Sequence, residues 1–155
     1  MPNQLTRILK EAISVEEESI KLYSDAQEKA RSASSKNFLK ELAKTELRHK
    51  KKLIEAIDKK ALIQGLGSRR GELLEDLRIV DYMKGIEELS EDADYQRILT
   101  YAAQREKKTH DYYVSLTKMF QGTQIGELFQ RLAEEELKHK IRLEKEYDDV
   151  LLKGN

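Results

Sequence analysis

The chain contains no cysteine, and its single proline is Pro2. Without thiols it can form no disulfide, zinc–thiolate site or iron–sulfur cluster, and it cannot use thiol catalysis. Without an internal proline, no residue forces a helix to break from Thr6 onward. At 155 residues the chain is long enough to bury a core without cross-links, and we expect one domain over residues 1–155.

An excess of one charge sign and a long apolar run are also absent. Lysine plus arginine and aspartate plus glutamate number 29 each. This balance gives no indication of nucleic-acid or anionic-membrane binding. No stretch approaches the ~18 apolar residues of a membrane span, and the N-terminus lacks the apolar segment of a signal peptide. We therefore expect a soluble, cytoplasmic protein.

Apolar residues recur at helical spacing through most of the chain, which predicts an all-α protein. Two antiparallel helical hairpins are predicted over about residues 5–60 and 93–152, with turns at the serine-rich residues 31–35 and at 121–123. The four helices are expected at about Thr6–Ala30 and Lys36–Lys60, then from near Asp92–Asp94 to Phe120, and at 123–152.

A long crossover of about residues 61–92 separates the hairpins. Within it, residues 72–83 and 86–89 have the pattern of short helices. Two hairpins joined by one long crossover form an antiparallel four-helix bundle.

A nonapeptide recurs at an offset of 90 residues: residues 42–50 (LAKTELRHK) and 132–140 (LAEEELKHK) share a Glu-x-x-His motif. Residues three apart on a helix face the same side, so each motif can direct a carboxylate and an imidazole at one centre. The same offset relates five upstream positions, which are Ile8/Ile98, Leu9/Leu99, Ala12/Ala102, Glu16/Glu106 and Tyr23/Tyr113. Four glutamates and two histidines at these spacings are the ligand set of a two-metal site in a four-helix bundle.

The predicted turns place the four glutamates at one height. Glu16 and Glu46 are equidistant from residue 31, and Glu106 and Glu136 are equidistant from residue 121. At 1.5 Å per residue, each lies about 22 Å from its turn. Because each also lies within an apolar stripe, the two hairpins can bring all four carboxylates together in the core.

Charge provides a second argument for metal ions. Buried, unpaired carboxylates would cost several kcal/mol each, and two divalent ions would neutralise four of them. Glutamate and histidine ligands without thiolate favour iron or manganese, with zinc as a further candidate by affinity. Since iron in an oxygen-rich site supports redox chemistry, we predict a di-iron centre that reacts with dioxygen or peroxide.

Further residues lie close to the predicted ligands in sequence. Tyr23 and Tyr113 are either core aromatics or partners that hydrogen-bond to the ligands and buffer redox changes. His110 has no counterpart in the first repeat. It is an extra ligand, a base beside the site, or a partly buried or surface histidine. Glu134 and Glu135 are expected to face solvent, with Glu135 the one that can also support the site.

With these motifs, the chain resembles the ferritin-like di-iron carboxylate superfamily, and within it the rubrerythrin-type proteins. The resemblance covers about residues 5–60 and 93–150 and implies a ferritin-like bundle. It implies two iron ions held by six ligands: Glu16, Glu46, His49, Glu106, Glu136 and His139. Activities of the family include hydrogen peroxide reduction, ferrous iron oxidation and dioxygen-dependent oxidation.

Three departures from the family pattern bear on function. Rubrerythrins usually carry a rubredoxin-like domain with four cysteines, so electrons are expected here from an external donor protein. They also tend to have a second carboxylate where this chain has Thr109, and His110 is the nearest substitute. Leu47 replaces the methionine that ligates haem in bacterioferritin, and 16 residues follow His139. We therefore expect neither haem nor a 24-subunit cage.

Three functional hypotheses follow from the sequence. The first is a rubrerythrin-like peroxidase or oxidase that acts on hydrogen peroxide or dioxygen. The second is a non-catalytic or ferroxidase-type protein that binds and handles iron, and sustained turnover would distinguish it from the first. The third is a structural bundle whose repeat records a duplicated hairpin, which metal-dependent stabilisation would contradict. A homodimer is one assembly that helix-rich surfaces of this kind allow.

Overall fold

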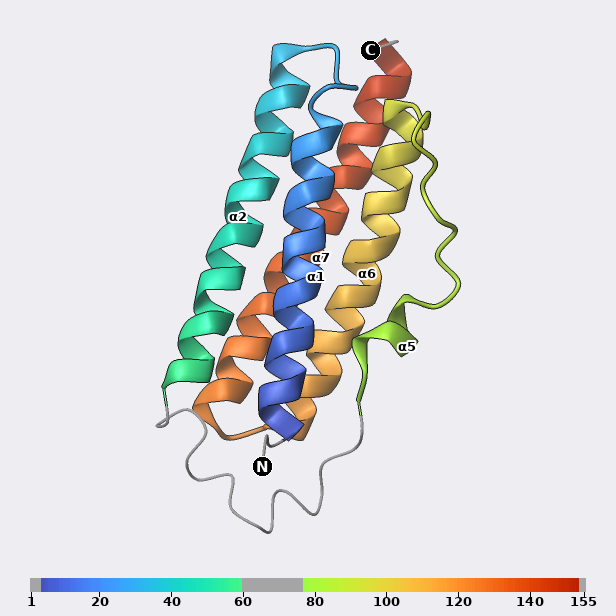
Figure 1. Cartoon of the computed structure of the whole chain (residues 1–155). Helices are drawn as coiled ribbons and strands as arrows, with labels where there is room; N and C mark the ends of the chain where they lie inside the picture. The colour runs from blue at the N-terminus through green and yellow to red at the C-terminus, as the bar shows by residue number, and fades with distance from the viewer. Residues whose placement is uncertain (1–3, 60–76, 154–155) are drawn as a thin grey trace.

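The computed structural model describes residues 4–59 and 77–153, where four long helices run side by side with a short helix beside them (Figure 1). These are α1 (Gln4–Ala26), α2 (Ala33–Asp58), α5 (Ile79–Met83), α6 (Tyr95–Met119) and α7 (Gln124–Lys153). Helices α1 and α2 form one antiparallel hairpin, and α6 and α7 form the other. No strand occurs within the described ranges. The predicted all-α, ferritin-like bundle of two hairpins is confirmed.

Polar side chains cap two of the long helices near their predicted starts. Ser32 Oγ accepts a hydrogen bond of 3.0 Å from the backbone N–H of Ser35, so α2 begins three residues before the predicted Lys36. Asp94 Oδ1 accepts a 2.8 Å hydrogen bond from the Arg97 N–H at the start of α6. Such caps satisfy N–H groups that have no partner within the helix.

The first helix is shorter than predicted. It ends at Ala26 instead of near Ala30, because the next residues form a turn in which the Lys29 N–H donates to the Ala26 carbonyl over 3.0 Å.

The crossover also differs from the prediction. Of the helix predicted over residues 72–83, the structure has α5 alone, and residues 72–76 lie outside the described residues. The short helix predicted over residues 86–89 was wrong, since these residues are not helical. Gly85 before them has a φ of 88°, which an α-helix cannot contain. A single turn after such a break is too short to form a helix by itself.

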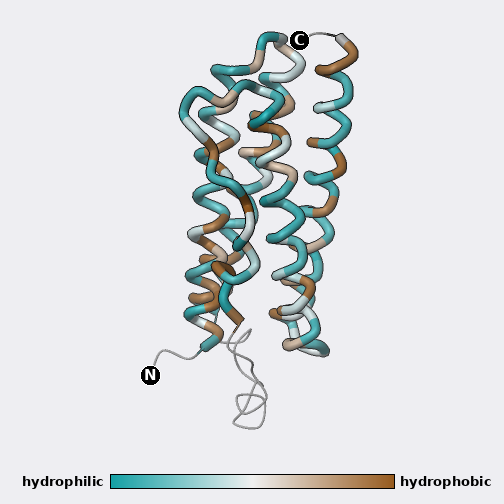
Figure 2. Tube along the Cα trace, turned by 90° about the vertical axis from the view of Figure 1, so that its right-hand side faces the viewer, coloured by the Kyte–Doolittle hydropathy of each residue, from teal (hydrophilic) through white to brown (hydrophobic). Residues whose placement is uncertain are grey.

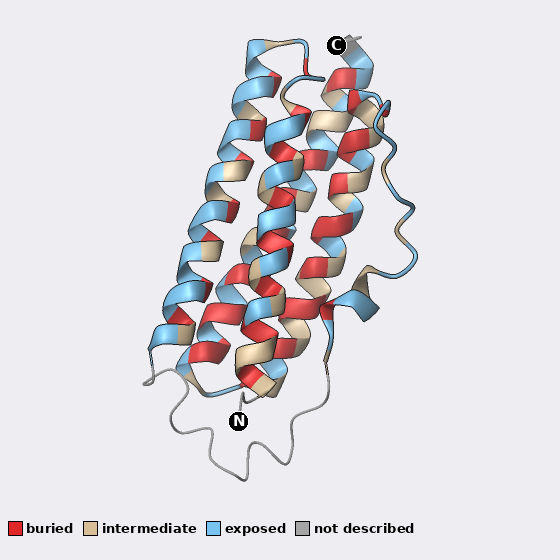
Figure 3. Ribbon diagram, viewed as in Figure 1, coloured by how far each residue is buried: buried red, intermediate tan, exposed pale blue. Residues whose placement is uncertain are grey.

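The apolar stripes of the long helices face the interior of the bundle (Figures 2 and 3). One buried cluster lies at the end of the bundle where α1 begins, and it includes Leu9, Leu53, Leu116 and Phe129. The other lies toward the opposite end of the bundle and includes Leu39, Leu42, Leu99 and Leu143. A layer of buried polar residues separates the two clusters along all four long helices.

The closest helix packing lies within each hairpin. Helix α1 packs mainly on α2, and α6 packs mainly on α7, whereas the backbones of different hairpins approach each other at fewer positions. The two hairpins therefore meet chiefly through their side chains. In the part of the chain that the structure describes, no helix has an apolar stretch of the kind that a bilayer crossing requires.

Candidate metal centre

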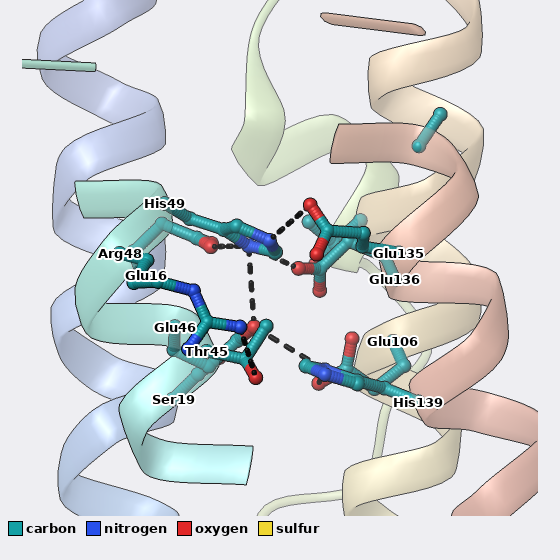
Figure 4. Close-up of polar contacts among 12 residues, drawn as sticks. Glu16, Ser19, Thr45, Glu46, Arg48, His49, Glu106, Glu135, Glu136 and His139 are labelled. Carbon is teal, nitrogen blue, oxygen red and sulfur yellow. Dashed lines mark hydrogen bonds and ion pairs between the residues drawn. The ribbon is translucent and has the colours of Figure 1, made fainter. Parts of the chain in front are cut away.

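The six predicted ligands belong to the buried polar layer, and the structure brings them together between the two hairpins (Figure 4). One comes from α1, two from α2, one from α6 and two from α7, and none is more than 4% exposed. They are Glu16, Glu46, His49, Glu106, Glu136 and His139. The helical repeat accounts for this arrangement, because equal distances from the two turns place these residues at one level.

The six residues form two overlapping groups of four, and in each group the candidate ligand atoms lie within 4.8 Å of one another. Glu46 and Glu136 belong to both groups, so they are placed to bridge two ions. The other four residues belong to one group each. Glu16 and His49 are in the first group, and Glu106 and His139 are in the second. The geometry thus separates shared carboxylates from those placed to bind a single ion.

Each group of four contains residues from both hairpins. The first takes three residues from the α1–α2 hairpin and Glu136 from α7. The second takes three residues from the α6–α7 hairpin and Glu46 from α2. An ion in either position would therefore connect the two hairpins.

Both imidazole rings direct Nδ1 toward the carboxylates. His49 Nδ1 lies 2.9 Å from Glu16 Oε1 and from Glu136 Oε1. His139 Nδ1 lies 3.3 Å from Glu46 Oε1 and 3.7 Å from Glu106 Oε1. The two rings are stacked, with centroids 6.2 Å apart. The nitrogens are thus oriented as two metal ligands would need to be.

The buried charges shift the pKa values of the cluster in opposite directions. Burial, with the charge of Glu46, raises the pKa of Glu16 to about 8. Burial and the charges of Glu106 and Glu46 also hold the pKa of Glu136 well above its usual range. For Glu46 itself, burial is outweighed by the neighbouring imidazoles of His139 and His49, which lower the pKa to about 2. Without metal, the cluster must therefore retain protons to balance its negative charge.

The cluster also contains buried atoms that lack a hydrogen-bond partner of suitable geometry. They are Glu16 Oε2, both oxygens of Glu46, Glu106 Oε2, Glu136 Oε1 and His139 Nδ1. An unsatisfied buried polar atom costs about 1–3 kcal/mol, and more when it is charged. Two divalent cations would provide partners for these atoms and would balance four carboxylates. The six residues therefore fit a pair of metal ions, and the oxygen and imidazole donors suit iron or manganese.

Comparison with known families agrees with this geometry. The sequence matches the rubrerythrin family model over residues 7–96 and again over residues 97–155. The chain belongs to the rubrerythrin family. The resemblance predicted from the sequence is thereby confirmed. Comparisons with curated proteins and with solved structures gave no match.

The two tyrosines predicted near the site of this rubrerythrin-family chain lie in different environments. Tyr23 Oη donates a 2.5 Å hydrogen bond to Glu106 Oε1, so a side chain of α1 fixes a carboxylate of α6. Tyr113 is completely buried, and its hydroxyl has no hydrogen-bond partner among the described residues. The repeat relates these tyrosines in sequence, but their contacts are not equivalent.

The structure does not place His110 among the candidate ligands. Its Nδ1 lies 2.8 Å from the Ala133 carbonyl, between α6 and α7, and it belongs to neither group of four. Thr109 is buried, and its hydroxyl donates to the Arg105 carbonyl in the preceding turn over 2.9 Å. The position one turn after Glu106 thus provides no carboxylate, and His110 does not replace it.

Glu135 contacts the site, which is the alternative to facing solvent that the sequence left open for it. Its Oε2 lies 3.1 Å from His49 Nε2, whereas the candidate metal ligands contact Nδ1 of the same ring (Figure 4). The equivalent residue in the first repeat is Thr45, which accepts a hydrogen bond from Arg48. The difference between the repeats at this position was visible in the sequence, but the contact across the hairpins was not.

We predict that Glu135→Gln weakens metal binding at the His49 position by about 10–100-fold, which is typical when a partner of a histidine ligand is lost. The Glu135 carboxylate fixes the orientation of the His49 ring and makes its Nδ1 a stronger metal ligand. Metal titration by calorimetry would measure this effect, with Glu134→Gln as the control because Glu134 is exposed on the same helix. Equal affinities in the two variants would contradict this role of Glu135.

Proposed function

We propose that this rubrerythrin-family chain is a di-iron oxidoreductase that reduces hydrogen peroxide or dioxygen with electrons from a separate donor protein. The observation that supports the proposal is the pair of buried four-residue groups that share Glu46 and Glu136. Bound iron would supply one-electron redox chemistry and a Lewis acid at the centre of the bundle.

The residues of the chain have distinct tasks in this proposal. Glu46 and Glu136 would contribute to both ion positions, with Glu16 and His49 completing one position and Glu106 and His139 the other. Tyr23 keeps Glu106 oriented through its hydrogen bond. Apolar clusters on both sides of the polar layer exclude bulk water, which strengthens electrostatic interactions within it.

A second candidate function is favoured by Thr109. Rubrerythrins tend to carry a carboxylate at this position, and here the threonine hydroxyl is engaged with its own helix. A centre without that carboxylate would oxidise ferrous iron and retain or release the ferric product, without a sustained reductive cycle. This candidate uses the same six ligands.

Turnover distinguishes the two candidates. Protein loaded with ferrous iron in the absence of oxygen would be given hydrogen peroxide in repeated portions, with and without a chemically reduced one-electron donor. We expect donor-dependent peroxide consumption that continues well beyond the electrons stored in the bound iron. A single stoichiometric oxidation, unaffected by the donor, would instead support iron handling. Metal-free protein treated in the same way provides the background rate.

A further inference from the structure

Three tyrosine rings, each in contact with the next, lead from the interior of the bundle to α5. The ring centroids of Tyr113 and Tyr112 lie 6.1 Å apart with an interplanar angle of 46°. Those of Tyr112 and Tyr82 lie 5.2 Å apart at 69°, edge to face. Both separations are within the range at which aromatic pairs make favourable contact. Electron tunnelling weakens steeply with distance, so rings in contact provide short steps.

The inner end of this row of rings is Tyr113, which lies two helical turns after Glu106, about 10 Å along the axis of α6. Tyr113 is completely buried on α6, in the helix that also carries Glu106. Burial, followed by the charges of Glu16 and Glu136, raises the pKa of Tyr113 well above its usual range.

The outer end is held in a defined position at the surface. Tyr82 is half-buried on α5, and its hydroxyl donates a 2.8 Å hydrogen bond to Ser115 Oγ on α6. The start of α5 is fixed to α1, because the Ile79 N–H donates to Glu11 Oε1 over 3.2 Å. Hydrogen bonds to α6 and α1 thus hold α5 in place, and with it the edge-to-face contact of Tyr82 with Tyr112.

The three hydroxyl groups differ in their ability to lose a proton. Those of Tyr112 and Tyr113 are buried and have no hydrogen-bond partner among the described residues. A phenol that loses an electron becomes strongly acidic, so it forms a stable neutral radical where the proton can leave. Of the three rings, Tyr82 meets this condition, because it is half-exposed and has a hydroxyl partner in Ser115.

We propose that Tyr113, Tyr112 and Tyr82 form an electron path through which Tyr82 supplies an electron to the metal centre when the external donor is exhausted. The proposal rests on the di-iron function proposed above. Reduction of one hydrogen peroxide to two waters takes two electrons and two protons. Where one remaining ferrous ion gives the first electron, Tyr82 gives the second. Tyr82 also releases its phenolic proton to water and becomes a neutral phenoxyl radical, while solvent supplies the other proton.

This path would move oxidising equivalents away from the buried ligands. A radical on Tyr82 lies at the surface, where a soluble one-electron reductant can restore the phenol. A radical confined to the core would instead damage side chains that hold the metal ions. The path therefore adds a protective role to a centre that handles strong oxidants.

The Tyr82→Phe variant tests the path, because it keeps the aromatic ring and its packing but removes the oxidisable hydroxyl. Tyr101→Phe is the matched control. Tyr101 is also a half-buried tyrosine, on α6, but its ring packs against the guanidinium of Arg97 and not against the three tyrosines of the path. Each ferrous-loaded protein would receive excess hydrogen peroxide without a donor. Rapidly frozen samples would be examined by electron paramagnetic resonance, and dityrosine cross-links would be mapped by mass spectrometry.

We expect a tyrosyl radical and Tyr82 cross-links in the wild type and in Tyr101→Phe, and loss of most of both signals in Tyr82→Phe. A second variant, Tyr112→Leu, interrupts the path and should also lose the radical while Tyr82 remains. An unchanged radical yield in Tyr82→Phe overturns the path. So does an equal yield in metal-free wild type, since peroxide would then oxidise Tyr82 directly. A protein that binds no iron overturns this inference together with the proposed function, whereas iron oxidation without a Tyr82-dependent radical overturns the path alone.

Discussion

Loading the metal-free protein with ferrous iron in the absence of oxygen should raise its melting temperature by on the order of 10 °C. An ion that binds only the folded state contributes about 4 kcal/mol at a free concentration of 1,000 times its dissociation constant. For a chain of this length, each kcal/mol corresponds to about 2–4 °C. The effect is expected to be large because each ion would connect the two hairpins and neutralise buried carboxylates.

Differential scanning calorimetry with and without a chelator would measure this shift. Magnesium at the same concentration is the control, because it prefers sites made entirely of oxygen ligands. If iron and magnesium left the melting temperature equally unchanged, the buried cluster would not be a transition-metal site. The chain would then be better described as a structural bundle with a duplicated hairpin.

The Glu136→Gln variant should lose metal binding without losing its fold. Glu136 belongs to both groups of four, so its loss affects both ion positions and should reduce bound iron from about two ions per chain to less than one. The metal-free variant should melt at or above the wild-type temperature. Burial already raises the pKa of Glu136, and an uncharged amide resembles the protonated carboxyl group that the metal-free protein favours.

Iron content would be measured by elemental analysis, and stability by thermal unfolding monitored by circular dichroism. The control is again Glu134→Gln, which changes the same charge on the exposed face of the same helix. Retention of both ions by Glu136→Gln would contradict a bridging role for this residue. A marked fall in the melting temperature of the metal-free variant would show that Glu136 is needed for folding itself.

The sequence allowed the six candidate ligands to be chosen, because two independent patterns identify them. The repeat pairs Glu16 with Glu106 and Glu46 with Glu136, and the helical stripe places each of them on a buried face. Distances to the turns then give a common height. Which carboxylates are shared between the two groups could not be predicted, since this depends on contacts between side chains of different hairpins.

The contacts that the sequence did not predict involve residues far apart in the chain. The contact between Glu135 and His49 crosses from α7 to α2, and periodicity within one helix carries no information about such pairs. The packing of Tyr82 on Tyr112 joins α5 to α6, and it is likewise a contact between side chains of different helices. A helical pattern over residues 86–89 was visible, but a single turn has too little cooperativity to form against the break at Gly85.

The division of the ligands between the two hairpins has a consequence for the order of folding. Contacts within a hairpin join residues close in sequence and can form quickly, whereas docking of the hairpins requires closure of the long crossover. Neither hairpin alone contains a complete group of four. We therefore expect tight iron capture to be a late step of folding, one that selects chains whose hairpins have docked in the correct register.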